Sequence, residues 1–164
     1  MTEATWFSGL PEEFVVFGMA MLPILELRGA IPWALKFAPD LPLASIYLFA
    51  VLGNFAPVIP ILLFLEPVSN YLRRVPVFDR FFTWLFARTR RRGRLVEKYE
   101  AIGLTFFVAI PLPVTGAWTG ALLAFLFGIR LRWAAVCIAL GVLIAGLVVT
   151  LASKGVIGIW HLAT

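Results

Sequence analysis

The sequence has little charge, one cysteine and one histidine. Only 14% of its 164 residues are charged, and Cys137 and His161 are the single members of their types. A lone cysteine excludes an internally disulfide-bonded scaffold. A lone histidine with no cysteine cluster leaves zinc binding and Ser-His-Asp hydrolysis without sequence support. We therefore expect a protein that is not an enzyme and holds no metal.

Apolar residues are correspondingly abundant. They make up 62% of the chain, and the mean hydropathy is +0.96. A soluble domain is about 45–50% apolar and about 25% charged. A chain of ~150 residues leaves about a third of its unfolded surface exposed, so it cannot hide this much apolar surface in a core. The composition predicts an all-α, multi-pass integral membrane protein, with residues 1–164 forming a single transmembrane domain.

Two stretches are free of charge and long enough to span a bilayer. Leu43–Leu65 has 23 residues and Trp133–Ser153 has 21, whereas a crossing helix needs about 20. Pro57 and Pro60 predict a kink in the second half of the first stretch. Asn54 is a polar residue within the same stretch. It either bonds a neighbouring helix or contributes to a substrate site.

Two other apolar stretches, Phe14–Phe37 and Ile102–Ile129, have helix-breaking residues in their middles. In the first stretch, a straight helix through Glu26 and Arg28 would place charges at the membrane centre, at about 2.5–3.5 kcal/mol each. Broken backbone at that depth is tolerated where protein or trapped water covers it. We interpret both stretches as re-entrant helical hairpins. The residues expected to shape their tips are Gly29, Pro32, Pro111, Pro113, Gly116 and Gly120.

The two halves of the chain resemble each other. A shift of 87 positions brings Arg28–Ala30 onto Thr115–Ala117 and Leu43–Leu65 onto Arg130–Ala152. Such weak internal symmetry is typical of transporter repeats, although short matches in apolar sequence also arise by chance. We predict a first repeat at about 12–65, a connector at 66–100 and a second repeat at about 101–153.

The distribution of charge predicts the topology. Residues 66–132 hold eleven basic and four acidic residues, a net charge of +7, whereas the remainder holds three basic and five acidic residues, a net charge of −2. Positive loops are usually cytoplasmic, so the connector 66–100 is expected inside the cell. The two crossing helices then run in opposite directions, which makes the repeats inverted. The acidic N-terminal residues do not resemble a signal peptide.

The basic connector also has an amphipathic pattern. Phe78, Phe81, Phe82 and Leu85 recur at helical spacing, which predicts a surface helix over 77–92 that contacts anionic lipid. A helix packed on the bundle would show the same stripe. The basic residues are clustered, not spread over a surface, so we expect no nucleic-acid partner.

One carboxylate and one guanidinium, Glu26 and Arg28, lie two residues apart inside an apolar segment. An ionisable pair inside a membrane segment is by default interpreted as a functional site. The alternative is that the pair only stabilises the shape of the hairpin. The second tip offers the hydroxyls of Thr115 and Thr119 at the start of a helix, where anions bind. The predicted substrate-binding residues are Glu26, Arg28, Asn54, Thr115 and Thr119; for the glycines alone, close helix packing is preferred.

Two blocks, Pro23–Pro32 and Pro111–Ala121, resemble the bacterial and archaeal small multi-drug export protein family. The resemblance covers about Phe14–Ser153 and implies a location in the inner membrane of a prokaryote. That family is distantly similar to the DedA superfamily, which implies two facing re-entrant hairpins and transport of polyprenyl phosphates or other lipids. DedA proteins carry arginine around the second hairpin, whereas this chain has Thr115 there.

These observations favour a transporter or lipid carrier whose site lies between two hairpins. The leading substrate class is an anionic lipid phosphate of the polyprenyl-phosphate type. Export of small amphiphilic drugs is the alternative. A non-transporting, membrane-shaping protein that uses the basic surface helix is a third interpretation. No cofactor is expected, and the sequence leaves open proton or sodium coupling and a homodimer.

Overall fold

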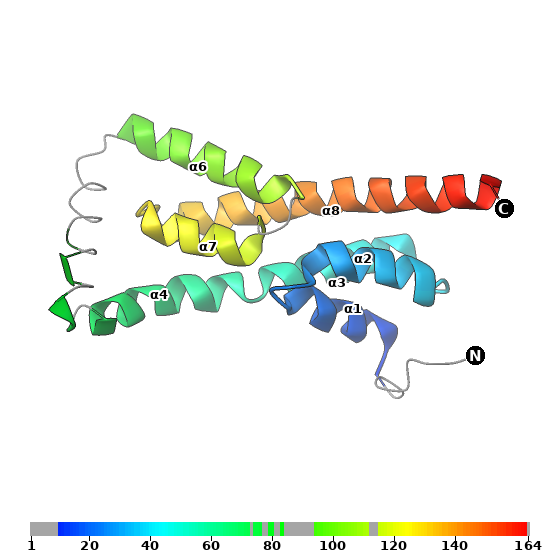
Figure 1. Cartoon of the computed structure of the whole chain (residues 1–164), viewed down its shortest axis with the longest axis horizontal. Helices are drawn as coiled ribbons and strands as arrows, with labels where there is room; N and C mark the ends of the chain where they lie inside the picture. The colour runs from blue at the N-terminus through cyan, green and yellow to red at the C-terminus, as the bar shows by residue number, and fades with distance from the viewer. Residues whose placement is uncertain are drawn as a thin grey trace. The chain divides into compact units, whose positions relative to one another are not determined.

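The computed structural model describes residues 10–72, 74–76, 79–80, 83, 94–111 and 115–163 (Figure 1). Every regular element among these residues is an α-helix, which confirms the all-α prediction. The chain forms two compact units. One comprises Met1–Ala56 with Leu143–Thr164, and the other comprises Pro57–Val142.

The first unit begins with a helix–turn–helix. Helix α1 spans Glu12–Met21 and helix α2 spans Glu26–Phe37. Helix α1 ends where Leu22 precedes Pro23, because a residue before proline avoids the helical conformation, and Leu22 is extended with φ −72° and ψ 134°. The turn therefore covers residues 22–25, one helical turn earlier than the charged pair that we expected at the tip.

Helix α3, Leu43–Phe55, packs against both α1 and α2. Small side chains let the three helices approach closely, and Ala20, Ala30, Ala34 and Ala50 are fully buried. Gly53 marks the tightest approach. A Cβ added there would collide with the main-chain carbonyl oxygen of Phe17 and would lie 3.0 Å from the Ala20 Cβ. Only glycine fits at this crossing of α3 and α1.

The predicted kink in the first long apolar stretch is confirmed. Helix α3 ends at Phe55, Ala56 and Pro57 form a turn, and helix α4 spans Val58–Leu72. Pro57 and Pro60 have no N–H and cannot continue the helical hydrogen-bond ladder. The apolar stretch Leu43–Ser69 nevertheless has 27 residues with a mean hydropathy of 2.3, which is long and apolar enough to cross a membrane.

The second unit also contains a pair of consecutive helices. Helix α6, Arg94–Ala109, is followed by helix α7, Ala117–Leu126, which also contacts α4. Helix α7 ends with the Ile129 N–H bonded to the Ala124 oxygen at 2.9 Å and the Gly128 N–H bonded to the Phe125 oxygen at 3.0 Å. This is a Schellman motif, and Gly128 supplies its left-handed residue, with φ 67°.

Helix α8, Leu131–Ala163, is the second long apolar helix and contributes to both units. Its segment Leu131–Val156 has 26 residues and a mean hydropathy of 2.7. One face is buried at helical spacing, for example at Ala134, Ile138 and Val142, while the outer face exposes Leu147 and Leu151. An outer face made of leucine is typical of contact with lipid.

The two units share a detail of helix packing. A Cβ added to Gly141 would lie 2.7 Å from the Val108 Cβ and 2.9 Å from the Thr105 main-chain oxygen. The residues of the first contact, Phe17, Ala20 and Gly53, become Thr105, Val108 and Gly141 when 88 is added to each number. The helices carrying the glycines begin at Leu43 and Leu131, which differ by the same number. The sequence shift of 87 was thus one residue short at these helices.

The predicted surface helix over 77–92 falls largely outside the described residues. Only Asp79, Arg80 and Thr83 of this segment are described. Its attachment to a membrane surface therefore stays a prediction.

Candidate functional site

Glu26 is the first residue of α2 and has an unusual backbone. Its φ is 48°, in the left-handed region, which costs a non-glycine residue roughly 1–2 kcal/mol. Its N–H donates to the Leu22 oxygen at 2.9 Å and closes the turn. The side chain is only 9% exposed. The fold therefore holds this carboxylate inside the protein despite a conformational cost.

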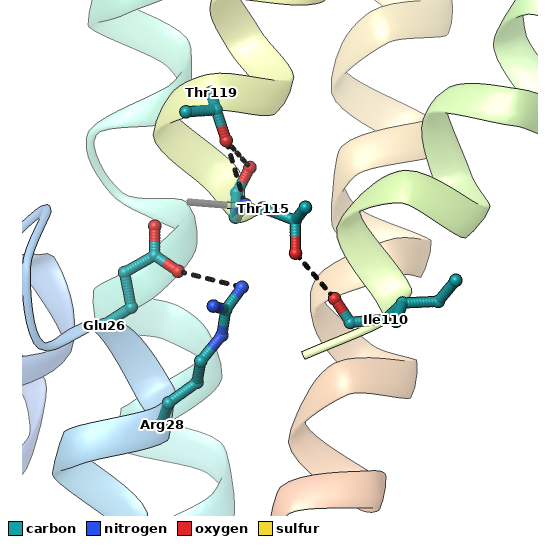
Figure 2. Close-up of polar contacts among 6 residues, drawn as sticks. Glu26, Arg28, Ile110, Thr115 and Thr119 are labelled. Atoms are coloured by element: carbon teal, nitrogen blue, oxygen red, sulfur yellow. Dashed lines mark hydrogen bonds and ion pairs between the residues drawn. The ribbon is translucent and has the colours of Figure 1, made fainter. Parts of the chain in front are cut away.

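The carboxylate forms an ion pair with Arg28. The Arg28 Nη2 atom lies 3.8 Å from the Glu26 Oε2 atom (Figure 2). Residues two apart on a regular helix point away from each other. The positive φ of Glu26 turns its backbone out of the helical conformation, which allows the two side chains to meet. The predicted pairing is confirmed, at a distance longer than a direct hydrogen bond.

Arg28 also lies four residues before a helix breaker. Pro32 is inside α2 and has no N–H, so it cannot donate to the Arg28 carbonyl as a regular helix would require. The Arg28 side chain is 23% exposed. A half-buried guanidinium thus lies in a helix turn whose backbone is already irregular.

Gly29 and Pro32 were expected to shape the hairpin tip, but both lie within α2. The tip is made by residues 22–25 because Pro23 stops α1 first. A Cβ added to Gly29 would lie 3.1 Å from the Leu25 Cβ and Cδ2 atoms. That approach is tight, but the half-exposed Leu25 can adjust. Gly29 is therefore not required by the turn.

At the second turn, the structure gives both predicted threonines local partners (Figure 2). The Thr115 hydroxyl donates to the Ile110 oxygen at 2.8 Å, bridging the end of α6 and the approach to α7. The Thr119 Oγ1 atom accepts from the Gly116 N–H at 2.9 Å and donates to the Gly116 oxygen at 3.2 Å. These bonds fix Thr115 and Gly116 at the start of α7.

Of the other residues expected at the second tip, Pro111 lies just after helix α6, in the segment that leads to α7. Pro113 lies outside the described residues. Gly120 lies where α7 meets α6, because an added Cβ would be 2.6 Å from the Val108 Cγ2 atom. This contact agrees with the prediction that Gly120 allows close helix packing.

Asn54 is 2% exposed, near the end of α3. Its Oδ1 atom is buried and, within the described part of the chain, has no hydrogen-bond partner. Among the described residues, the Oδ1 atom therefore accepts no bond from a neighbouring helix, which was one of the two alternatives for Asn54. A buried amide oxygen in this state is uncommon in a native protein.

A further polar contact was not anticipated from the sequence. The Tyr47 hydroxyl donates to the Leu143 oxygen at 2.9 Å and links α3 to α8 within the first unit. Gly146 makes room for the ring, because an added Cβ there would lie 2.8 Å from the Tyr47 Cε2 atom. A tyrosine in one apolar stretch and a glycine in another were the only sequence signals for this contact.

Comparison with known proteins identifies the family. No curated protein and no solved structure matches the chain. The similarity to the DedA superfamily stays a prediction. Residues 26–148 match the family model described as "Putative small multi-drug export protein". Together with the two long apolar helices, this match indicates a membrane location. Because the matched segment covers most of the sequence, the chain belongs to the small multi-drug export protein family.

Proposed function

We propose that the protein is a membrane transporter, not an enzyme, and that Arg28 binds the phosphate of an anionic lipid. The ion pair of Arg28 with the buried Glu26 is the observation that carries this proposal. A charge inside a membrane segment is costly and usually marks a transport pathway. Here two such charges are retained next to an irregular backbone.

The geometry of the pair suits an exchange of partners. Arginine presents several donors in a planar fork that matches phosphate oxygens, whereas lysine is a point charge. At 3.8 Å, the Glu26 carboxylate holds the guanidinium electrostatically without a direct hydrogen bond between these two atoms. A lipid phosphate would replace Glu26 as the partner of Arg28, and protonation of Glu26 would favour that replacement. Glu26 would then act as a gate.

Export of small cationic amphiphiles is the second candidate function, favoured by the description of the family. In that case the roles of the two charges reverse. The Glu26 carboxylate would bind the cation and exchange protons, while Arg28 would only balance its charge. Asn54, Thr115 and Thr119 remain proposed contacts in both cases, although the threonines would first have to release their backbone partners.

We further propose that the α1–α2 and α6–α7 pairs are re-entrant hairpins. Helices α1 and α7 have 10 residues each and α2 has 12, so each rises about 15–18 Å. The hydrocarbon core is about 30 Å thick, so none of these helices alone would cross it. Such a short helix would enter the membrane and return with its partner. The basic segment 66–100 would remain cytoplasmic.

An inverted repeat is part of the same proposal. The equivalent contacts of Gly53 and Gly141, 88 positions apart, support it. The opposite directions expected for the two crossing helices, from the charge distribution, support the inversion.

The test compares two substrates in vesicles of one composition. A polyprenyl phosphate and a lipophilic cation are offered to the wild type and to the Arg28→Lys, Arg28→Ala and Glu26→Gln variants. For a lipid-phosphate carrier, Arg28→Lys and Arg28→Ala should abolish phosphate transport. Lys36→Gln is the matched control, because Lys36 is an exposed charge at the other end of the same helix and should be dispensable.

For a cation exporter, Glu26→Gln should abolish transport and Arg28→Lys should retain it. Activity of the wild type on neither substrate, with all variants folded, would contradict both candidate functions. The membrane-shaping interpretation would then remain.

A further inference from the structure

The first observation is the buried amide of Asn54. Its Oδ1 atom accepts no hydrogen bond within the described part of the chain, and the residue is 2% exposed. Leaving such an atom unsatisfied costs about 1–3 kcal/mol. Native structures normally give a buried polar oxygen a hydrogen-bond partner, and an oxygen without a protein partner points to a bound water or ion. The environment of Asn54 therefore requires a partner that the described residues do not provide.

The second observation is the helix break beside it. Pro57 and Pro60 lack an N–H, so the carbonyl oxygens of Gly53 and Ala56 lose the donors that a continuous helix would offer. The backbone hydrogen bonds on either side of the break have other acceptor oxygens. The Ala56 N–H donates to the Leu52 oxygen at 2.9 Å, and the Ile61 N–H donates to the Pro57 oxygen at 3.0 Å. Neither of them uses the Gly53 or Ala56 oxygen.

From these observations we propose that the C-terminal end of α3 binds a monovalent cation, with sodium as the expected ion. The ligands would be the Asn54 Oδ1 atom and the carbonyl oxygens of Gly53 and Ala56, completed by water. All three residues lie within four positions and in the same compact unit. The proposal names a coupling ion for the transporter proposed above, but its evidence does not depend on Arg28 or Glu26.

The chemistry of the ligands selects the kind of ion. All three atoms are neutral oxygens, and residues 43–65 contain no charged side chain. Calcium sites normally include carboxylates, and magnesium retains waters and carboxylates, so a neutral set suits neither divalent ion. The C-terminal end of a helix carries a partial negative charge, which attracts cations. Unwound carbonyls of interrupted membrane helices are known to coordinate sodium.

The test measures the thermal stability of the purified full-length protein in detergent. Sodium chloride is compared with N-methyl-D-glucamine chloride at equal ionic strength, with no substrate present. If sodium binds the folded state, the Tm should be higher in sodium chloride than in N-methyl-D-glucamine chloride. The difference should increase with the sodium concentration. At about 100 times Kd the rise should be roughly 5–10 °C. Potassium chloride tests whether the smaller ion is preferred.

Two variants and one control assign the effect to the site. Asn54→Leu should abolish the sodium-dependent rise. Asn54→Asp keeps the volume and adds a charged ligand, so it should bind sodium more tightly and reach the plateau at a lower concentration. Tyr47→Phe is the control, because it removes the bond to the Leu143 oxygen from the same helix without altering the break. It should retain the full sodium response.

A wild type that sodium stabilises no more than N-methyl-D-glucamine would overturn the proposal. So would an Asn54→Leu variant with an undiminished sodium response. A more stable Asn54→Leu variant, with no sodium effect in either protein, would likewise overturn it, because the amide would then be a buried group that no ligand compensates. If the sodium response is intact but Arg28 variants transport normally, only the proposed substrate site fails.

Discussion

Gly53 lies directly against the main-chain carbonyl of Phe17, at the point where α3 crosses α1. The Ala20 Cβ atom would be 3.0 Å from a Cβ at Gly53, so the contact has no spare volume on the side-chain side either. Backbone cannot move aside as the end of a flexible side chain can. The position of α3 on the first helix–turn–helix therefore depends on this glycine.

We expect Gly53→Ala to destabilise the protein by about 1–3 kcal/mol, the usual cost of overpacking a core. Thermal or denaturant unfolding in detergent would measure the loss. Gly18→Ala is the matched control on α1, because no atom of another described residue is found within 4 Å of a Cβ added there. Since alanine favours a helix over glycine, that control should be neutral or slightly stabilising.

The same loss is expected for Gly141→Ala, because its Cβ would meet Val108 and the Thr105 oxygen. Gly103→Ala is the matched control on α6, since in the part of the chain that the structure describes no contact within 4 Å of the added Cβ is found. If the two packing contacts are equivalent, the two losses should agree within about 1 kcal/mol. A stable Gly141→Ala protein beside an unstable Gly53→Ala protein would argue against a structural repeat.

The sequence predicted most of the helical framework. Uninterrupted apolar runs of adequate length located α8 and the α3–α4 stretch, and Pro57 indicated the break. These features depend on local composition and on the missing N–H of proline. The contacts of Gly53 and Gly141 could not be predicted, since they depend on how distant helices cross. Their 88-residue offset became visible only once the contacts were known.

The backbone of Glu26 permits a second prediction. Its φ of 48° favours glycine, so Glu26→Gly relieves strain while losing the ion pair. Glu26→Gln loses the charge and keeps the strain. We expect the glycine variant to be the more stable of the two, by up to about 1 kcal/mol, because the left-handed conformation costs roughly 1–2 kcal/mol.

The control for this comparison is the same pair of changes at Glu13, in the first turn of α1. Glu13 has no positive φ, so glycine should be the less stable replacement there. Unfolding in detergent measures all four variants. Finding glycine the worse replacement at both positions would show that the Glu26 backbone is not strained.

The third prediction concerns the hydroxyl of Thr115. Thr115→Val removes its bond to the Ile110 oxygen and should cost about 1 kcal/mol. Thr115→Ser keeps the donor and should preserve most of the stability. If the hydroxyl only holds the turn, both variants should transport normally once folded. A folded Thr115→Val protein that has lost transport would instead indicate contact with the substrate.

The candidate site was only partly predictable from the sequence. Glu26 and Arg28 stood out because charges are rare in apolar segments, and their pairing followed from the need to offset each charge. The local bonds of Thr115 and Thr119 depend on the backbone geometry at the start of α7, which the sequence does not specify. The Asn54 Oδ1 atom has no hydrogen-bond partner among the described residues, and no sequence pattern predicts such a missing bond.

The last prediction tests the membrane topology with single cysteines. Asp40 and Arg130 are exposed and lie next to the two long apolar stretches. In a Cys137→Ala background, Asp40→Cys should react with a membrane-impermeant maleimide on intact cells, while Arg130→Cys should react only after permeabilisation. The physical reason is the net charge of +7 over residues 66–132, which should keep that region cytoplasmic. If each hairpin returns to its own side, α3–α4 is the only crossing between the two labels, and they must lie on opposite faces. Equal labelling of both cysteines on intact cells would exclude re-entrant hairpins combined with two crossing helices.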